Sequence, residues 1–228
     1  MGNIKQGILG GFSGKVGTVV GSNWKGISYM RAIAPSIRDA RTAKQLAQRE
    51  KFTYIRAARG GTGYAKVGGN YGGGMRASQD AIKYNCKDVL WLDAAEHKYV
   101  EEIGTSNAFF VIGDEVITAP LDSGTILPGI TRNSVIQLLH KWGIQVSERK
   151  LSIEEITAAA RDGTLKEIFA SGTAAVISPI GWLNIKGEDM QVADGKVGPI
   201  AQRLYDKLYG MQTGVVADDM GWTYPLGF

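Results

Sequence analysis

Apolar and polar positions follow two different patterns on either side of a boundary near residue 53. Residues 1–26 contain eight glycines, and short β-like runs lie at 16–20 and 27–30. Glycine is entropically costly inside regular elements, so this part is predicted to form turns and short strands. The next run, 36–52, is rich in Ala, Gln, Lys and Arg and predicts a helix with a weak apolar stripe.

From residue 54 onward, helical and strand periods are mixed along the chain. Their runs predict a helix at 74–85, a strand at 89–93, a hairpin at 107–120, a turn followed by a helix within 127–143, a strand at 144–151, a helix at 152–163, a strand pair at 167–180 and a helix at 198–211. Because these elements do not alternate as regular βαβ units, the predicted fold class is α+β.

Two of these predicted helices carry clear local signals. In the helix at 152–163, Ser152 stands three residues before Glu155, which is the spacing of a capping box. The helix at 127–143 is amphipathic, and it has an apolar face made of Val135, Ile136, Leu138, Leu139 and Trp142.

Charge is distributed unevenly between the two parts. Residues 1–51 carry nine Lys or Arg against two acidic residues, a balance of +7 in a chain whose formal net charge is +4. The remainder therefore has an excess of three acidic residues, and this asymmetry favours two units of different origin. A basic segment can bind nucleic acid, but it is more commonly a solvated face, so nucleic acid is not the favoured partner.

No run reaches the roughly 18 uninterrupted apolar residues that a membrane-spanning helix needs. The N-terminal segment also has no secretory cleavage pattern, so a cytoplasmic protein without a membrane partner is expected. Cys86 is the only cysteine, which rules out an internal disulfide. His97 and His140 lie far apart in sequence, and no metal site is expected.

Two glycine-rich stretches resemble phosphate loops but fail on detail. The stretch 11–18 lacks both the first glycine and the final Ser or Thr of a P-loop, and 61–69 lacks the third glycine of a dinucleotide fingerprint. Neither is taken as a nucleotide site.

The stretch AKVGGNYGGGM (65–75) places Lys66 beside several glycines and Tyr71. Covalent amine catalysis needs a held lysine, and pyridoxal phosphate also needs backbone N–H groups for its phosphate and a carboxylate for its ring nitrogen. The chain offers a glutamate within 101–107, a helix start at 127–132 and a turn at 171–175. A glycine-rich lysine loop is also common as an ordinary turn, so composition leaves both interpretations open.

Residues 54–71, YIRAARGGTGYAKVGGNY, closely resemble the cofactor-lysine segment of branched-chain amino acid aminotransferases, which are pyridoxal phosphate enzymes of fold type IV. The resemblance continues in the same order through about three quarters of the chain, in 89–111, 125–136, 168–180, 208–214 and 221–223. It implies the large domain of the D-amino-acid-aminotransferase-like fold, a mixed sheet or pseudo-barrel with flanking helices.

The resemblance also implies roles for individual residues. Lys66 matches the lysine that forms a Schiff base with pyridoxal phosphate and moves the proton at the substrate α-carbon. Tyr71 matches the residue that hydrogen-bonds the phenolic oxygen of the cofactor, and Glu102 matches the carboxylate that faces the pyridine nitrogen. Thr105 would touch the cofactor or its neighbours.

Further along the chain, Leu127 would pack on the cofactor ring. The backbone N–H groups of Ile130 and Thr131, together with the Thr173 side chain, would hold the phosphate. The turn at Thr173 and Ala174 would present N–H groups to the substrate carboxylate.

The first 52 residues do not follow this resemblance. They do not look like the small N-terminal domain of the aminotransferases, and residues 1–50 instead resemble a separate family of small bacterial proteins of unknown function. The expected organisation is a glycine-rich basic segment at 1–52 and a pyridoxal phosphate-binding domain at 53–228 that lacks the usual small domain. The join is expected to come from a fused or misassembled coding sequence.

Three functions remain open at this point. The first is a branched-chain amino acid aminotransferase that passes the amino group of Leu, Ile or Val to 2-oxoglutarate, as a cytoplasmic homodimer active in amino-acid biosynthesis. The second is a truncated or fused cofactor domain with little or no turnover. The third is a binding or structural module that uses the basic N-terminus.

Overall fold

The computed structural model describes residues 3–4, 12–16, 19–24, 27–32, 62–185 and 187–224. The chain divides into two compact units, residues 1–49 and 50–228. In the first unit an antiparallel sheet follows the chain order β1 (Asn3–Ile4), β2 (Phe12–Val16), β3 (Val19–Trp24) and β4 (Ile27–Ala32). The helix predicted at 36–52 lies outside the described residues.

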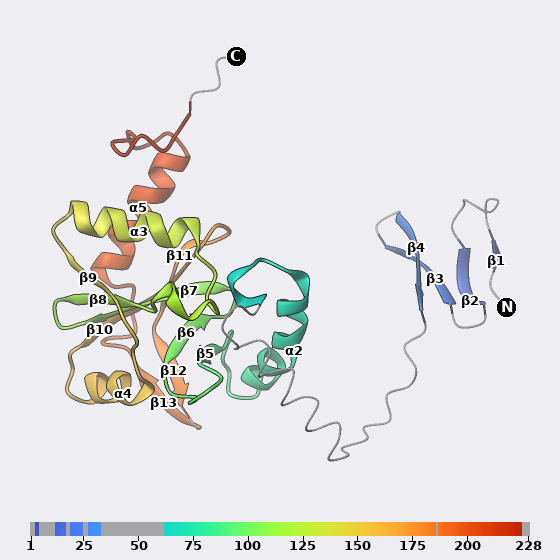
Figure 1. Ribbon diagram of the computed structural model, residues 1–228, viewed down its shortest axis with the longest axis horizontal. Helices are drawn as coiled ribbons and strands as arrows, with labels where there is room; N and C mark the ends of the chain where they lie inside the picture. Colours follow the sequence, from blue (N-terminus) through green and yellow to red (C-terminus); the bar gives the residue numbers. More distant parts are fainter. Residues whose placement is uncertain are drawn as a thin grey trace. The chain divides into compact units, whose positions relative to one another are not determined.

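In the second unit, helices and strands are mixed as the sequence predicts, and the α+β class is confirmed (Figure 1). The helices are η1 (Thr62–Tyr64), α2 (Gly68–Ile82), η2 (Leu121–Ser123), α3 (Ile130–Lys141), α4 (Ile153–Arg161) and α5 (Pro199–Gln212). The strands are β5 (Leu90–Leu92), β6 (Val100–Ile103), β7 (Ser106–Ile112), β8 (Glu115–Thr118), β9 (Gln145–Glu148), β10 (Leu165–Gly172), β11 (Val176–Ile180), β12 (Trp182–Ile185) and β13 (Glu188–Gln191).

Strand β7 is the centre of a seven-stranded sheet within the described part of the chain. One edge of β7 pairs with β10, which in turn pairs with β11. The other edge pairs with β6 near its start and with β8 toward its end, and β5 pairs with β6. All of these pairs are antiparallel, whereas β8 and β9 are parallel and are joined through α3.

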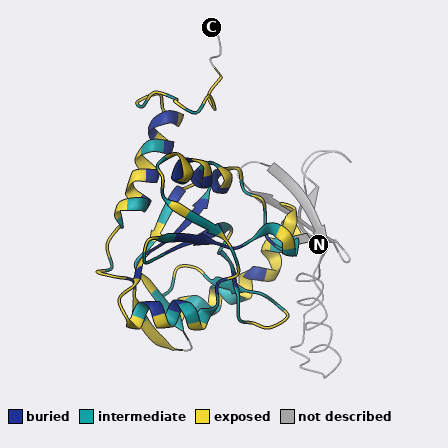
Figure 2. Cartoon of the chain, turned by 60° about the vertical axis from the view of Figure 1, so that its left-hand side comes forward, coloured by how far each residue is buried: buried dark blue, intermediate teal, exposed yellow. Residues whose placement is uncertain are grey.

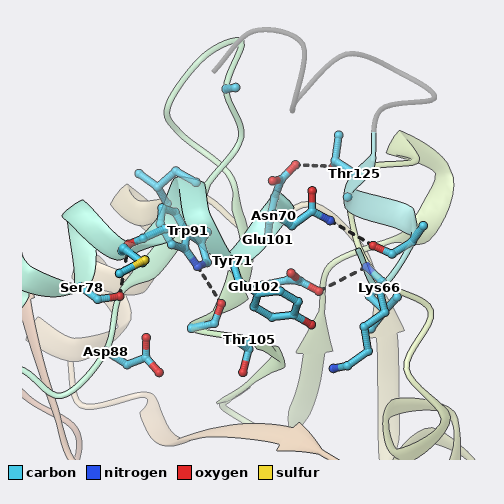
Figure 3. Close-up of a pocket in the computed structure, with 18 of the residues that line it drawn as sticks. Lys66, Asn70, Tyr71, Ser78, Asp88, Trp91, Glu101, Glu102, Thr105 and Thr125 are labelled. Carbon is cyan, nitrogen blue, oxygen red and sulfur yellow. Dashed lines mark hydrogen bonds between the residues drawn. The ribbon is translucent and has the colours of Figure 1, made fainter. Parts of the chain in front are cut away.

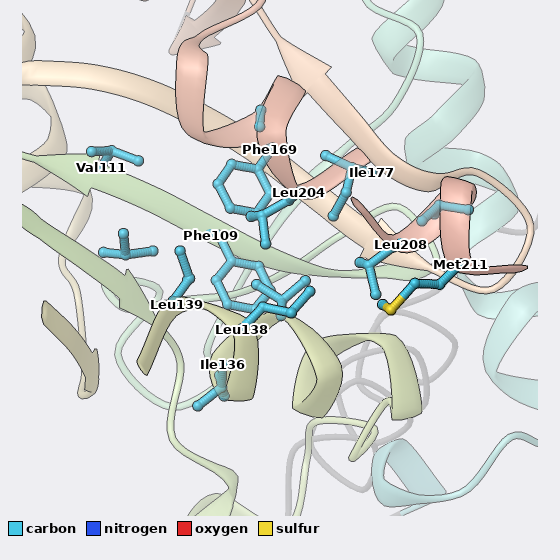
Figure 4. Close-up of a cluster of buried hydrophobic side chains, with 14 residues drawn as sticks. Phe109, Val111, Ile136, Leu138, Leu139, Phe169, Ile177, Leu204, Leu208 and Met211 are labelled. Carbon is cyan, nitrogen blue, oxygen red and sulfur yellow. The ribbon is translucent and has the colours of Figure 1, made fainter. Parts of the chain in front are cut away.

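One face of this sheet is covered by α3 and α5 (Figure 4). At its centre the rings of Phe109 and Phe169, from the paired strands β7 and β10, stack with centroids 5.1 Å apart. Leu138 and Leu139 of α3 and Leu204 of α5 pack in the same cluster and are fully buried. Burying side chains of this size contributes about 2 kcal/mol each, which makes this cluster a main source of stability.

The opposite face of the sheet is covered by α4 and by the segment around Val192. Ala108 and Phe110 of β7 point to this side, as alternation along a strand requires. Ile156 of α4 packs against them and is fully buried. In Figure 2 the buried residues gather in the sheet and on the sides of the helices that face it.

The local signals at helix ends agree with the structure in part. The backbone N–H of Glu155 donates to Ser152 Oγ at 3.1 Å, so the predicted cap of α4 is confirmed. The helix predicted at 74–85 is wrong at both ends, because α2 already begins at Gly68 and ends at Ile82. The hairpin of β12 and β13 was not predicted, since its residues lack a strong alternation of apolar and polar positions.

Candidate functional site

A cavity of about 470 Å³ lies between α2 and the strands β5 and β6. Figure 3 shows that side chains from α2, from the segment before it and from the β6–β7 region converge there. Five of the residues singled out in the sequence line this one cavity: Lys66, Tyr71, Glu102, Thr105 and Leu127. They come from segments up to about 60 residues apart, which only the fold brings together.

Lys66 stands at the open side of the cavity, two residues before α2 begins. Its Nζ lies 5.6 Å from the centroid of the Tyr71 ring, within the range of a cation–π contact. Both side chains are exposed, and Tyr71 keeps 40% of its surface accessible. The Asn70 side chain donates to the Ala65 carbonyl at 3.0 Å, which holds the lysine segment against the start of the helix.

Glu102 lies on β6, and its carboxylate is held from two sides. Its Oε1 accepts hydrogen bonds from Asn107 Nδ2 at 3.3 Å and from the backbone N–H of Leu127 at 3.2 Å. Asn107 Nδ2 also donates to the Leu127 carbonyl at 2.8 Å. A carboxylate held in this way is oriented before any ligand arrives.

The walls of the cavity are tied to each other by two further hydrogen bonds. Trp91 Nε1 donates to the Gly104 carbonyl at 2.8 Å, and Thr125 Oγ1 donates to Glu101 at 2.6 Å. Trp91 also packs beside Gly74, the one buried residue of α2, where an added Cβ would lie 3.3 Å from the indole ring. The glycine therefore allows α2 to approach this wall closely.

Ile130 and Thr131 are the first two residues of α3. The first backbone N–H groups of a helix have no acceptor within the helix, so such a start is suited to bind a phosphate. Thr131 is buried and Ile130 is 79% exposed, and neither lines the cavity around Lys66. They follow directly after the turn at Leu127, which does line it.

Thr173 and Ala174 form the exposed turn between β10 and β11 and do not line this cavity either. The pairing of Ser171 with Asn107 places this turn at the end of the sheet where β7 begins. The start of α3 lies at the same end, because Gly129 packs against the Asn107 side chain. The roles of these residues stay predictions.

The structure adds Asn107 and Ser171 to the residues of interest. Asn107 is 5% exposed and Ser171 is 1% exposed, and the Ser171 hydroxyl has no hydrogen-bond partner within the described part of the chain. In the sequence, each of these two residues is recognisable only as a polar side chain at the edge of an apolar strand run. That pattern does not predict which distant residues such a side chain contacts.

The donor set of the cavity fits pyridoxal phosphate. The amine of Lys66, the phenol of Tyr71 and the oriented carboxylate of Glu102 line the same cavity. They suit, in that order, the aldehyde, the phenolic oxygen and the ring nitrogen of the cofactor.

Among the residues that the structure describes, no group of three or more His, Cys, Asp or Glu is arranged to hold a metal ion. No described helix is long and apolar enough to cross a membrane.

Comparison with known proteins gives a consistent result. The family model for amino-transferase class IV matches residues 28–181. Branched-chain-amino-acid aminotransferase 2 of Bacillus subtilis is 52% identical over 170 residues, which cover 75% of this chain and 47% of that protein. Branched-chain-amino-acid aminotransferase of Mycobacterium tuberculosis is 44% identical over 178 residues, covering 76% of this chain and 48% of that protein.

Solved structures agree with these relatives. The T.th. branched-chain amino acid aminotransferase, in complex with N-(5'-phosphopyridoxyl)-L-glutamate, superposes with a TM-score of 0.60 at 31% identity. The match covers 74% of this chain and 54% of that one. The enzyme from Escherichia coli matches with a TM-score of 0.58 at 34% identity, over 70% of this chain and 50% of that one. The chain thus spans about half the length of the curated relatives it matches.

Proposed function

Because this chain belongs to the class IV aminotransferases, we propose that it transfers the amino group of leucine, isoleucine or valine to 2-oxoglutarate. Enzymes of this family use pyridoxal phosphate, and solved relatives hold derivatives of it. The observation that carries the proposal is the shared cavity of Lys66, Tyr71 and Glu102. The bacterial relatives named for branched-chain substrates support the substrate class.

When bound, the cofactor supplies an electron sink for the pair released at the substrate α-carbon. In this proposal Lys66 would hold the cofactor covalently until the substrate amine takes its place, and the freed Nζ would then carry the proton to and from that carbon. Tyr71 follows Lys66 by five residues and forms a wall of the same cavity, so its hydroxyl is suited to hydrogen-bond the phenolic oxygen. Glu102 would keep the ring nitrogen protonated, since its carboxylate is already oriented by two donors.

The remaining roles are positional. Leu127 would pack on the ring from the turn before α3, and Thr105 would contact the ligand from the β6–β7 turn. The N–H groups of Ile130 and Thr131 would hold the phosphate together with the hydroxyl of Thr173. Thr173 and Ala174 would bind the substrate carboxylate through their N–H groups.

Apolar residues on the cavity wall support a branched aliphatic substrate. Met75, Leu92 and Trp91 line the cavity beside the polar groups. A branched aliphatic side chain that binds against this wall would bury its apolar surface away from water. Its binding is therefore favoured over that of a polar side chain of similar size.

We further propose that the protein works as a cytoplasmic homodimer. Tyr71, Met75 and Ile82 recur along one side of α2 at helical spacing, Val67 stands at its N-cap, and all four are exposed. Tyr71 and Met75 also line the cavity. A second copy that covers this stripe would remove apolar surface from water and close the open side of the cavity.

Borohydride reduction of the protein in the presence of pyridoxal phosphate tests the role of Lys66. We expect a single labelled peptide that contains Lys66, and no label in the Lys66→Ala variant. Lys196→Ala is a matched control, because it lies in the same Lys-Val-Gly triplet, is exposed and does not line the cavity. A label on another peptide would exclude the assigned role.

Turnover is measured with leucine and 2-oxoglutarate, and glutamate is the expected product. Lys66→Ala should abolish its formation, because the amine both binds the cofactor and moves the proton. Cofactor that binds at Lys66 without any glutamate formed would instead identify a cofactor-binding domain without turnover.

A further inference from the structure

Asn107 links two parts of the site that are far apart in sequence. We propose that Asn107 is a positioning residue whose amide ties the Glu102 carboxylate to the turn at 127–129 and so sets the spacing between the groups that hold opposite ends of the cofactor. The inference rests on the proposed function, because it assigns Glu102 to the ring nitrogen and the start of α3 to the phosphate.

The register of the sheet brings Asn107 to this place. Glu102 on β6 is paired directly with Asn107 on β7, which is paired in turn with Ser171 on β10. Directly paired residues of antiparallel strands point to the same face of the sheet. The three polar side chains therefore form a row across three strands, and Asn107 is its buried centre.

The hydrogen bonds of this amide form a closed set. A side-chain amide has two N–H groups. In Asn107 both are used, since Nδ2 donates to Glu102 Oε1 at 3.3 Å and to the Leu127 carbonyl at 2.8 Å. The Leu127 N–H returns to the same Glu102 oxygen at 3.2 Å, so each of the three residues is bonded to the other two.

The other side of the amide supports the turn. A Cβ at Gly129 would collide with Asn107 Oδ1, so only glycine lets the backbone lie this close to the amide. Gly129 is also the N-cap of α3, which makes it the last residue before the helix. The start of α3 thus packs directly against the Asn107 side chain.

This arrangement matters because the ring of pyridoxal phosphate is rigid. Its nitrogen and its phosphate are joined by this ring and one short arm, so their separation varies little and the two protein groups must be held in register within roughly half an ångström. A neutral amide suits this position, since it donates to the carboxylate and brings no charge of its own. An aspartate there would repel Glu102 and leave the Leu127 carbonyl with only the backbone N–H of Gly129 as a donor.

The first test uses the cofactor-free protein. Asn107→Asp keeps the shape of the side chain and removes the donor, and Asn85→Asp makes the same chemical change at an exposed turn. Hydrogen exchange is followed on peptides that cover residues 124–131. We expect at least tenfold faster exchange there in Asn107→Asp only, with the peptides of β10 and α5 unchanged.

The second test adds pyridoxal phosphate. Asn107→Asp should weaken its binding at least tenfold and shift the pH dependence of its visible absorption, while borohydride still labels Lys66. Gly129→Ala should produce the same two effects with the amide intact, because the added methyl group pushes the turn away. This second variant decides the matter if Asn107→Asp does not fold.

The outcomes separate the two proposals. An unmutated chain that fails to bind pyridoxal phosphate would overturn the proposed function. Normal binding by that chain, with unchanged exchange and affinity in both variants, would overturn only the role of Asn107. Faster exchange spread evenly over the whole chain would also overturn it, since that result describes a general loss of stability.

Discussion

The exposure of Lys66 is the residue-scale feature with the clearest chemical consequence. Its amine lies over the Tyr71 ring at the open side of the cavity, where water reaches both side chains. Proton transfer at an amine is best controlled when water is excluded. The proposed reaction would therefore need this side of the site to be covered, by bound ligands or by a second subunit.

Ser171 offers a prediction at the same scale. Its hydroxyl is buried and finds no partner among the described residues, and an unsatisfied buried polar group costs about 1–3 kcal/mol. We expect Ser171→Ala to raise the free energy of unfolding of the cofactor-free protein by ~1 kcal/mol, as measured by urea denaturation.

Ser178→Ala on the neighbouring strand β11 is the matched control, because that residue is half-buried and carries no comparable cost. A loss of stability in Ser171→Ala would mean that the hydroxyl has a partner that stabilises the fold.

Individual residues also show what sequence reasoning can reach. Lys66, Tyr71, Glu102 and Leu127 were placed in one site because their motifs occur in the order of a known family. The hydrogen bonds that orient Glu102 were not predicted, since one joins it to Leu127, 25 positions away, and the other crosses from β6 to Asn107 on β7. Such contacts depend on the register of β6 with β7 and on the path of the chain before α3, which no local pattern encodes.

At the scale of elements, α2 is a helix that its own composition does not favour. Five glycines lie between Gly68 and Gly74, and each lowers helix stability by about 0.5–1 kcal/mol relative to alanine. The structure shows one compensating contact, where Gly74 lies against Trp91. Because of the same low propensity, the helix predicted from the sequence begins six residues too late.

Gly74→Leu tests this contact. The added side chain must displace either α2 or the indole, because a Cβ alone already lies 3.3 Å from the Trp91 ring. We expect cofactor affinity to fall at least fivefold, since Lys66 and Tyr71 move with α2. Gly72→Leu on the same helix has open space around its Cβ and should leave the affinity within twofold. Equal effects of the two variants would contradict the role of the contact.

The segment after α5, residues 213–224, is held against α3 and α5 through ion pairs of Asp219. Lys141 at the end of α3 donates to its carboxylate at 2.8 Å, and Lys207 of α5 lies 2.6 Å from it. The hydrogen bonds from Lys141 and Lys207 lower the pKa of Asp219 to about 2 from 3.8. A carboxylate whose pKa is lower in the folded state stabilises that state at pH values above its pKa in the unfolded chain. The contribution of Asp219 to stability is therefore complete above pH 3.8 and is lost as the pH falls toward 2.

Hydrogen exchange of residues 214–224 measures this dependence. After correction for the intrinsic effect of pH, we expect protection that is constant above about pH 4 and declines below it. Asp219→Asn should show low protection at neutral pH, because the charge that attracts both lysines is gone. Parallel profiles for the two proteins would exclude the carboxylate as the fastening group.

At the scale of the whole molecule, the buried clusters on both faces of the large sheet are built from residues between Val100 and Met211. The α+β architecture of the second unit was predictable because its patterns are strong and local. The first unit consists of short strands interrupted by glycine, and there the alternation of apolar and polar residues predicts the strand bounds less well.

A chain that begins at Glu50 tests the independence of the second unit. We expect its thermal midpoint to stay within about 3 °C of the full chain, a shift that corresponds to ~1 kcal/mol for a domain of this size. Calorimetry measures the midpoint, and light scattering reports any aggregation. A larger fall, or aggregation of the shortened chain, would show that the first unit supports the second.

The parallel pairing of β8 with β9 has a consequence for the order of folding. Two parallel strands cannot be joined by a tight turn, so this pair forms only after the whole connection through α3 has been made. The turn at 127–129 lies inside that connection, whereas the β7–β8 hairpin is local and can assemble early. A refolding chain should therefore acquire its ability to capture pyridoxal phosphate later than most of its secondary structure, as a slow kinetic phase.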